Sequence, residues 1–124
     1  MIIRQIEIGA MDNFSYIVGC EKTRKALVID PGAEAERIAR EAKRDNLEIE
    51  LIVNTHGHGD HTAESARLRE LTGAEIVMHA EDASAGNPAD IRLTGDTTLN
   101  VGELTFQVIH TPGHTPGGIC LYAE

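Results

Sequence analysis

The stretch Leu51-Ile52-Val53-Asn54-Thr55-His56-Gly57-His58-Gly59-Asp60-His61 places three imidazoles and a carboxylate directly after an apolar run. Such a density of potential ligands is hard to explain by packing or by a solvated surface. In an extended segment, residues two positions apart point the same way, so His56 and His58 can hold one cation between them. Neutral imidazole and carboxylate ligands suit zinc, with iron and manganese as alternatives. The stretch therefore predicts a metal site at the end of a strand.

The residues after this cluster predict a helix from Thr62 to Thr72, which Gly73 ends. The cluster then lies at the carboxyl end of a strand, where open α/β sheets tend to build their sites. The turn into the helix directs Asp60 and His61 toward a second, adjacent metal position. Taken alone, Asp60 fits equally well as the N-cap of this helix, where its carboxylate would accept backbone hydrogen bonds.

The segments on either side predict a single α/β domain. Alternating and apolar runs predict strands, and a run of Ala, Glu, Arg and Lys between Gly32 and Asn46 predicts a surface helix with pairs such as Glu36 and Arg40. The expected strands are Ile2 to Ile8, Phe14 to Cys20, Ala26 to Ile29, Leu51 to Val53, Ala74 to His79, Leu104 to Ile109 and Gly118 to Tyr122. Breaks are expected at Gly9 to Asn13, at Glu21 to Lys25 and in a loop from Ala80 to Asp96.

The composition limits the classes of partner. The chain has 124 residues, of which 41% are hydrophobic, enough for one ordinary core. Its 20 acidic and 11 basic residues give a net charge of -9, which argues against a nucleic acid or an anionic membrane as partner. No segment approaches the roughly 18 consecutive apolar residues of a membrane span, and the N-terminus lacks a signal-peptide pattern. We expect a soluble, cytoplasmic protein that binds a small molecule or another protein.

The two cysteines predict no redox site. Cys20 and Cys120 lie far apart, each within an apolar strand-like run, and neither has the close partner spacing of a metal site or a redox pair. We expect both to be reduced thiols in the core.

Two motifs carry a resemblance to a known family. Thr55 to His61 resembles the signature of the metallo-β-lactamase superfamily, and Thr111-Pro112-Gly113-His114-Thr115-Pro116-Gly117-Gly118 is similar to that family's later loop with one more ligand histidine. Asn13 to Val18 and Val28 to Gly32 match as well, so the resemblance spans essentially the whole chain. It implies an α/β fold, the N-terminal half of the four-layer αββα sandwich, with a mixed sheet and helices on one side.

The resemblance also implies roles for individual residues. His56, His58 and His114 would bind a first metal, and Asp60 and His61 would belong to a second, with Asp60 also orienting the attacking hydroxide as the catalytic residue. In the family, a second half then brings a bridging aspartate and a further histidine, so residues 1–124 are expected to form a metallo-β-lactamase-like domain that is incomplete at the C-terminus.

Three other polar residues are left outside this metal set. Asp96, in Thr94-Gly95-Asp96-Thr97, resembles the bridging motif but precedes His114, so we interpret it as a turn residue. His79 ends a strand, where the family often has a histidine that is not a ligand, and a structural role is expected for it. The direction of His110 cannot be decided from strand alternation.

A zinc site predicts hydrolysis. Zinc lowers the pKa of bound water toward about 7, so that a hydroxide can attack a carbonyl carbon without a protein nucleophile. The sequence has no G-x-S-x-G nucleophile turn. The resemblance is greatest to glyoxalase II-like proteins, which implies a small thioester substrate such as S-lactoylglutathione. The alternatives are a mononuclear iron persulfide dioxygenase of the same superfamily and a non-catalytic metal-binding fragment.

The family fold also predicts how the chain behaves in solution. One half alone would leave the apolar sides of Phe14 to Cys20 and Leu104 to Ile109 uncovered, and Gly118 to Tyr122 near an open sheet edge. We therefore expect the chain to self-associate, to aggregate, or to bind a separate C-terminal half.

Overall fold

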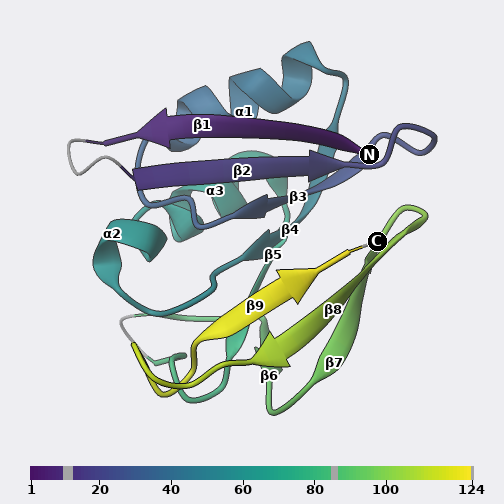
Figure 1. Ribbon diagram of the computed structural model, residues 1–124. Coiled ribbons are helices and arrows are strands. Elements are labelled where there is room, and N and C mark those ends of the chain that lie inside the picture. The colour runs from purple at the N-terminus through teal and green to yellow at the C-terminus, as the bar shows by residue number, and fades with distance from the viewer. Residues whose placement is uncertain (10–12, 85–86, 124) are drawn as a thin grey trace.

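The computed structural model describes residues 1–9, 13–84 and 87–123, and it places their strands in two sheets (Figure 1). The larger sheet has the order β1 (Ile2–Ile8), β2 (Asn13–Gly19), β3 (Lys25–Ile29), β4 (Glu48–Val53), β5 (Glu75–His79) and β6 (Ile91–Leu93). The smaller sheet consists of β7 (Thr97–Val101), β8 (Leu104–His110) and β9 (Ile119–Tyr122). The helices are α1 (Ala35–Arg44), α2 (Gly59–Thr62) and α3 (Ser65–Thr72). Part of the expected break between Gly9 and Asn13 lies outside the described residues.

The larger sheet is mixed. Strands β1 to β3 pair antiparallel, whereas β3 to β6 pair parallel. Parallel neighbours need a crossover connection, which α1 supplies between β3 and β4, and α2 with α3 between β4 and β5. The carboxyl ends of β3, β4 and β5 consequently lie at one edge of the sheet, and the loops that follow these strands meet there.

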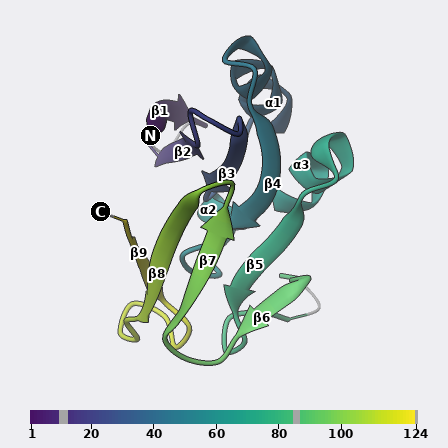
Figure 2. The same cartoon turned by 90° about the vertical axis from the view of Figure 1, so that its right-hand side faces the viewer.

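The molecule has three layers, with the larger sheet in the middle. Figure 2 shows α1 and α3 on one side of this sheet and β7, β8 and β9 on the other. One core fills the space between the helices and the sheet, and a second core fills the space between the two sheets. The first contains Ile17, Val28, Ile38, Ile52 and Leu68, and the second contains Val18, Leu27, Val53, Phe106 and Val108. This confirms the predicted mixed sheet with helices on one side.

The expectation that the inner apolar faces are left uncovered is wrong. Val18 of β2, and Phe106 and Val108 of β8, are buried in the core between the two sheets. The physical reason is that β7, β8 and β9 form a sheet of their own, which packs its apolar side against β2 to β6. The expectation for β9 is confirmed, since among the described strands it pairs only with β8 and so lies at a sheet edge.

The sequence did not predict two short strands, β6 within the expected loop from Ala80 to Asp96 and β7 directly after it. Strand β6 has only three residues, too few to show an alternating pattern, and in β7 only Leu99 and Val101 are buried. Asp96 lies in the bend between these strands, where its Oδ1 accepts a hydrogen bond from the backbone N–H of His110 (2.9 Å). This confirms the interpretation of Asp96 as a turn residue.

The expectation of two core thiols is half wrong. Cys20 is buried, but Cys120 is exposed, and both are free thiols. Strand alternation explains the difference, because Ile119 faces the core between the sheets and the next residue of β9 must then face outward.

The helices are short and joined by charged side chains. Glu36 of α1 forms an ion pair with Arg67 of α3 (2.8 Å), where pairing with Arg40 along the same helix was expected.

Among the described residues, no helix has both the length and the apolar character needed to cross a membrane.

Candidate metal centre

The loop after β4 carries His56 and His58. The N–H of Asn54 still donates to the carbonyl of Val77 on β5 (2.9 Å), and beyond it the chain bends. The two imidazole rings lie with their centroids 5.0 Å apart and their planes at 80°. The rings therefore converge because the loop bends, and the extended segment expected from the sequence is not formed.

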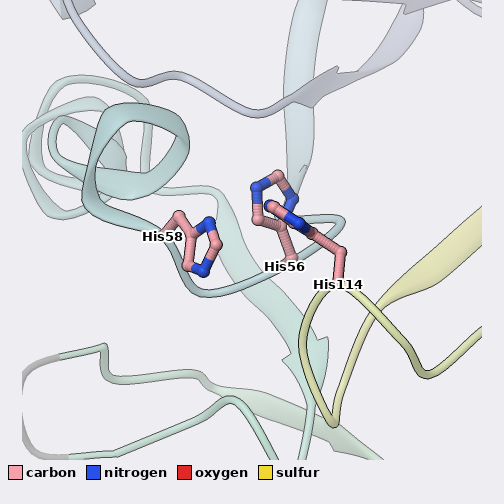
Figure 3. A group of neighbouring side chains, drawn as sticks. All are labelled: His56, His58 and His114. Atoms are coloured by element: carbon pink, nitrogen blue, oxygen red, sulfur yellow. The ribbon is translucent and has the colours of Figure 1, made fainter.

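His114 reaches these rings from the loop between β8 and β9 (Figure 3). A hydrogen bond from the N–H of Thr111 to the carbonyl of Gly118 closes this loop (2.8 Å). The His114 ring lies 4.4 Å from that of His58 and 5.3 Å from that of His56. One ring nitrogen from each histidine lies within 4.8 Å of the other two. His58 and His114 are exposed, so this three-histidine cluster opens to solvent, and three nitrogen donors with an open position are typical of a catalytic zinc site.

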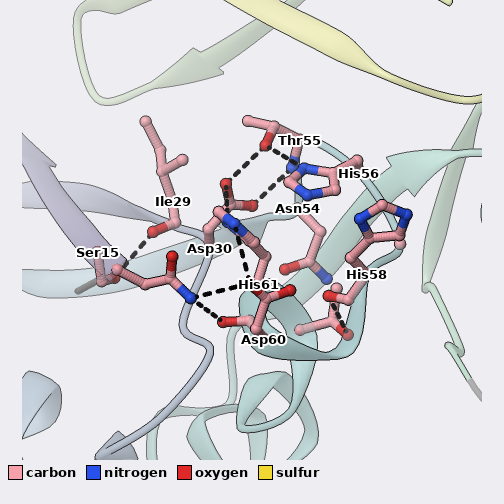
Figure 4. A network of polar contacts seen from close by, with 12 residues as sticks. Ser15, Ile29, Asp30, Asn54, Thr55, His56, His58, Asp60 and His61 are labelled. Carbon is pink, nitrogen blue, oxygen red and sulfur yellow. Dashed lines mark hydrogen bonds and ion pairs between the residues drawn. The ribbon is translucent and has the colours of Figure 1, made fainter. Parts of the chain in front are cut away.

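Asp30 is a residue of this site that the sequence analysis missed. It follows β3 at the same sheet edge, is 7% exposed, and has a left-handed backbone conformation (φ 49°). Its Oδ1 accepts a hydrogen bond from the N–H of Thr55 (2.7 Å) and its Oδ2 from the Thr55 hydroxyl (2.6 Å), as Figure 4 shows. One sequence signal could have identified Asp30: it is an aspartate directly after an apolar strand. Parallel pairing of β3 with β4 places such a residue beside the histidine cluster.

Asp30 and Thr55 together orient two of the histidines. Because the Thr55 hydroxyl donates to Asp30, its oxygen can accept a hydrogen bond from Nδ1 of His56 at 3.1 Å. Nδ1 of His61 lies 3.3 Å from Oδ2 of Asp30 and can donate to it. A neutral imidazole that donates through Nδ1 leaves Nε2 free as a metal ligand, and carboxylates commonly orient metal-binding histidines in this way.

Asp60 and His61 lie in α2, next to His56. The N-cap of α2 is His58, so the alternative interpretation of Asp60 as the N-cap is wrong. Oδ2 of Asp60 accepts a hydrogen bond from the side chain of Asn13 (3.0 Å) and lies 3.7 Å from Nε2 of His61. The His56 and His61 rings are 4.2 Å apart, and Asp30, His56 and His61 each offer a ligand atom within 4.8 Å of the others.

The helix expected from Thr62 to Thr72 begins earlier and is interrupted. The N–H of Glu64 donates to the carbonyl of Pro31 (3.0 Å), which separates α2 from α3. The turn at Pro31 and Gly32 packs tightly on α2, because a Cβ atom at Gly32 would lie 1.8 Å from the carbonyl oxygen of Asp60. Gly73 ends α3 in the left-handed conformation (φ 76°), as predicted.

The surroundings shift the pKa values of three residues in different directions. Burial, and then the nearby His61, lower the pKa of His56, so that its imidazole is neutral at neutral pH. The hydrogen bond to Asp30 raises the pKa of His61. The hydrogen bond from Asn13 lowers the pKa of Asp60. The site therefore combines a neutral imidazole, an imidazole that holds its proton more tightly, and an ionised carboxylate.

His79 and His110 stack on each other, with centroids 3.9 Å apart and planes at 15°. Glu81 offers a carboxylate oxygen near them, within 4.8 Å of one nitrogen of each ring. A metal ion lies close to the plane of each imidazole that binds it, so two nearly parallel rings do not direct their lone pairs at one ion. Nδ1 of His79 accepts the N–H of Glu81 (3.1 Å), which leaves the proton of the neutral ring on Nε2. Nε2 of His110 lies 2.8 Å from the carbonyl of Pro116 and so supports the His114 loop.

A mixed sheet that gathers imidazoles and carboxylates at the carboxyl ends of its parallel strands is the framework of an α/β metalloprotein. Residues 8–124 match the sequence profile of the Metallo-beta-lactamase superfamily, and the chain belongs to this superfamily. The resemblance predicted from the two histidine motifs is thereby confirmed.

The relatives include proteins named hydroxyacylglutathione hydrolase. The chain is 35% identical to the hydroxyacylglutathione hydrolase of Nitrosococcus oceani, over 99% of this chain and 47% of that protein. It is 36% identical to an uncharacterised protein of Aquifex aeolicus, over 100% of this chain and 66% of that protein. The chain thus spans between about half and two thirds of the length of these relatives.

Solved structures show the same fold. The crystal structure of ETHE1 from Myxococcus xanthus matches with a TM-score of 0.86 at 34% identity, over 99% of this chain and 54% of that chain. The BLEG-1 B3 metallo-beta-lactamase matches with a TM-score of 0.88 at 28% identity, over 98% of this chain and 67% of that chain.

Proposed function

We propose that this chain carries the metal-binding part of a metal-dependent hydrolase that acts on small thioesters. The observation that supports this most directly is the convergence of His56, His58 and His114, with one ligand atom each within 4.8 Å. The similarity to hydroxyacylglutathione hydrolases supports the thioester as the substrate class. The proposed metal is zinc, as one or two ions, with iron or manganese as alternatives.

The donor set fits such a metal. His56, His58 and His114 would hold the first ion, and Asp60 with His61 would contribute to a second. A bound divalent metal would supply an activated water and would polarise the carbonyl of the substrate. Asp30 and Thr55 hold the rings of His56 and His61 in place, so the site is ordered before an ion arrives.

The other residues are consistent with thioester cleavage. The carboxylate of Asp60, held by Asn13, lies beside the cluster and can accept a hydrogen bond from an attacking water. The leaving group of a thioester is a thiolate, which departs without protonation by a strong general acid. The cluster therefore needs neither a protein nucleophile nor a proton donor for this reaction.

Metal analysis and a hydrolysis assay test this proposal. Chelator-stripped protein that is reconstituted with zinc at neutral pH should hold about one ion per chain, because three histidines complete one site. The second position should be weak or empty there, since it needs His61, whose pKa is raised. The double variant His56→Ala, His114→Ala should lose this ion, whereas Asp90→Asn, which lies away from the cluster, should keep it. Equal metal content in the wild type and the double variant would refute the assignment.

Activity is measured as thiol release from S-lactoylglutathione. Residues 1–124 alone should turn over slowly, because the family's bridging aspartate lies in the second half. A longer chain that includes this half should be faster by on the order of 100-fold, since loose positioning of a reacting group costs about that much. Asp60→Ala in the longer chain should abolish most of the gain. A longer chain with full metal occupancy and no thiol release would contradict the thioester as substrate.

A second candidate is the iron persulfide dioxygenase reaction. Asp30, His56 and His61 have the composition of a two-histidine, one-carboxylate iron site. Against it, both carboxylate oxygens of Asp30 already accept hydrogen bonds from Thr55. Iron reconstitution followed by oxygen uptake on addition of a persulfide distinguishes the two reactions. Metal binding without turnover in either assay would support the non-catalytic alternative.

A further inference from the structure

The two loops that carry the three-histidine cluster are joined by Asp82. This residue follows β5 at the same sheet edge as Asp30 and the His56 loop. Its Oδ2 accepts hydrogen bonds from the N–H of Gly57 (2.7 Å) and the hydroxyl of Thr115 (2.7 Å), and its Oδ1 accepts one from the N–H of Gly117 (2.8 Å). Gly57 lies between the two histidines of the first loop, and Thr115 directly follows His114.

The backbone of Asp82 is anchored at the end of β5. The backbone N–H of Asp82 donates to the carbonyl of His79, the last residue of β5 (3.0 Å). A hydrogen bond from the N–H of Ile119 to the carbonyl of Thr55 (2.8 Å) joins the two loops at their bases. Asp82 adds a second connection between the two loops, closer to the histidines. It therefore links a fixed point of the sheet to both sides of the cluster.

Glycines in both loops leave room for this side chain. A Cβ atom at Gly117 would lie 2.8 Å from Oδ1 of Asp82, closer than real Cβ contacts. A Cβ atom at Gly57 would lie 3.3 Å from Cβ of Asp82 and 3.1 Å from the side-chain nitrogen of Asn87. By contrast, a Cβ atom at Gly113, in the loop of His114, or at Gly59, the first residue of α2, would meet no other described side chain or loop within 4 Å. Gly118, in the same loop as Gly117, is crowded by a different group, the carbonyl oxygen of Thr111 (2.9 Å). Close approach to Asp82 itself is found at the two glycines whose N–H groups Asp82 binds.

The charge of Asp82 suits this role. Burial raises the pKa of the carboxyl, but the hydrogen bonds from Thr115, Gly117 and Gly57 together outweigh it, and the pKa lies below its ordinary value. An ionised carboxylate accepts all three hydrogen bonds at once, and such bonds are roughly twice as strong as those between neutral groups.

We propose that Asp82 is a positioning residue that sets the spacing between the His56 and His58 loop and the His114 loop. This inference rests on the proposed metal-binding function. Metal–ligand distances must be met to within about 0.2 Å, so a small displacement of one loop removes a ligand from the ion. Asp82 thereby determines both the affinity for the metal and the geometry of its coordination, without contacting the metal itself.

The variants Asp82→Asn and Asp82→Ala test this inference. An asparagine keeps the shape but replaces one acceptor oxygen with an NH₂ donor, which must then face a Gly57, Thr115 or Gly117 donor. Alanine removes all three contacts. Asp90→Asn is a matched control, because Asp90 also accepts three hydrogen bonds, two from Arg69 and one from the N–H of Ile76, but lies away from both loops.

Two measurements are made on the wild type and on each variant that circular dichroism shows to be folded. One is zinc affinity by competition with a chelator, and the other is the visible absorption spectrum of the Co²⁺-loaded protein, which reports coordination geometry. We expect both Asp82 variants to bind zinc about 10- to 100-fold more weakly and to show an altered Co²⁺ spectrum. Asp90→Asn should keep the wild-type affinity and spectrum even if it unfolds at a lower temperature.

The outcomes separate this inference from the proposed function. Wild-type affinity and an unchanged Co²⁺ spectrum in folded Asp82→Asn and Asp82→Ala would overturn the role of Asp82. A folded wild-type chain that binds neither zinc nor Co²⁺ would instead overturn the proposed function. If the Asp82 variants do not fold, Thr115→Val and Gly117→Ala replace them, and wild-type affinity and spectrum in both would overturn the inference.

Discussion

At the scale of single residues, the pKa values of His56 and His61 are shifted in opposite directions. Burial lowers the pKa of His56, so its neutral form stabilises the fold above the ordinary pKa of about 6.5, and this contribution is lost as the pH falls. Asp30 raises the pKa of His61, so protonated His61 stabilises the metal-free fold below about pH 6.5, and this contribution is lost as the pH rises through the raised pKa. A metal must displace the proton from His61 but finds His56 already neutral.

We therefore expect the two metal positions to load at different pH. The ion held by His56, His58 and His114 should persist to lower pH, because burial lowers the pKa of His56 and the metal meets this ring in its neutral form. The ion that needs His61 should dissociate at higher pH. Equilibrium dialysis against zinc at a series of pH values, followed by elemental analysis, gives the number of ions per chain at each pH. Asp30→Asn removes the carboxylate that raises the pKa of His61, so it should bring the pH values at which the two ions dissociate closer together. Loss of both ions at the same pH in the wild type would contradict the expectation.

At the scale of elements, α2 is held in place by the turn after β3. A Cβ atom at Gly32 would lie 1.8 Å from the carbonyl oxygen of Asp60, a backbone atom that no side-chain rotation can move aside. Gly32→Ala should therefore lower the free energy of unfolding by about 1–3 kcal/mol, the usual cost of overpacking. It should also displace Asp60 and His61 from His56.

Gly59 provides the matched control for this prediction. It is the first residue of α2, and nothing lies within 4 Å of the position of an added Cβ. Gly59→Ala should raise the free energy of unfolding by up to about 1 kcal/mol, because alanine is the better helix former. Urea unfolding of both variants measures the difference. Equal stability of the two would show that the turn at Gly32 does not constrain α2.

At the scale of the whole molecule, exposed large hydrophobic side chains include Ile3 and Phe14 on the larger sheet, Leu71 on α3, and two residues of the smaller sheet. Ile109 and Tyr122 are 43% and 54% exposed, and both lie on the outer face of the smaller sheet, where Ile109 pairs with Cys120. In the described residues, α1 and α3 contribute to the core on the other side of the larger sheet only. The helices that the structure describes therefore leave the outer face of the smaller sheet uncovered.

We expect the chain to self-associate through this outer face. The association should be weaker than it would be if an inner apolar face were uncovered. Sedimentation at several concentrations should show dimers that Tyr122→Ser reduces. Leu71→Gln is the control, because Leu71 is similarly exposed (41%) but lies on α3. A wild-type chain that stays monomeric at every concentration would refute the expected self-association.

The amino-acid sequence by itself determined the metal-ligand motifs and most of the elements that carry them. Histidine spacing in Thr55 to His61, the apolar run before it and Gly73 after α3 are local signals, because each depends only on neighbours along the chain. The second histidine motif, from Thr111 to Gly118, could be found in the same way.

Only the tertiary structure decided which distant residues complete the site. Asp30, Asn13 and Asp82 come from three separate segments, and no local pattern shows that they meet the histidines. Parallel pairing of β3, β4 and β5 brings Asp30, His56 and Asp82 to one sheet edge, and packing of the smaller sheet delivers His114 to the same place. Pairing and packing depend on contacts between residues far apart in the chain. The same long-range contacts buried the inner faces of β2 and β8, which a local pattern could only describe as apolar.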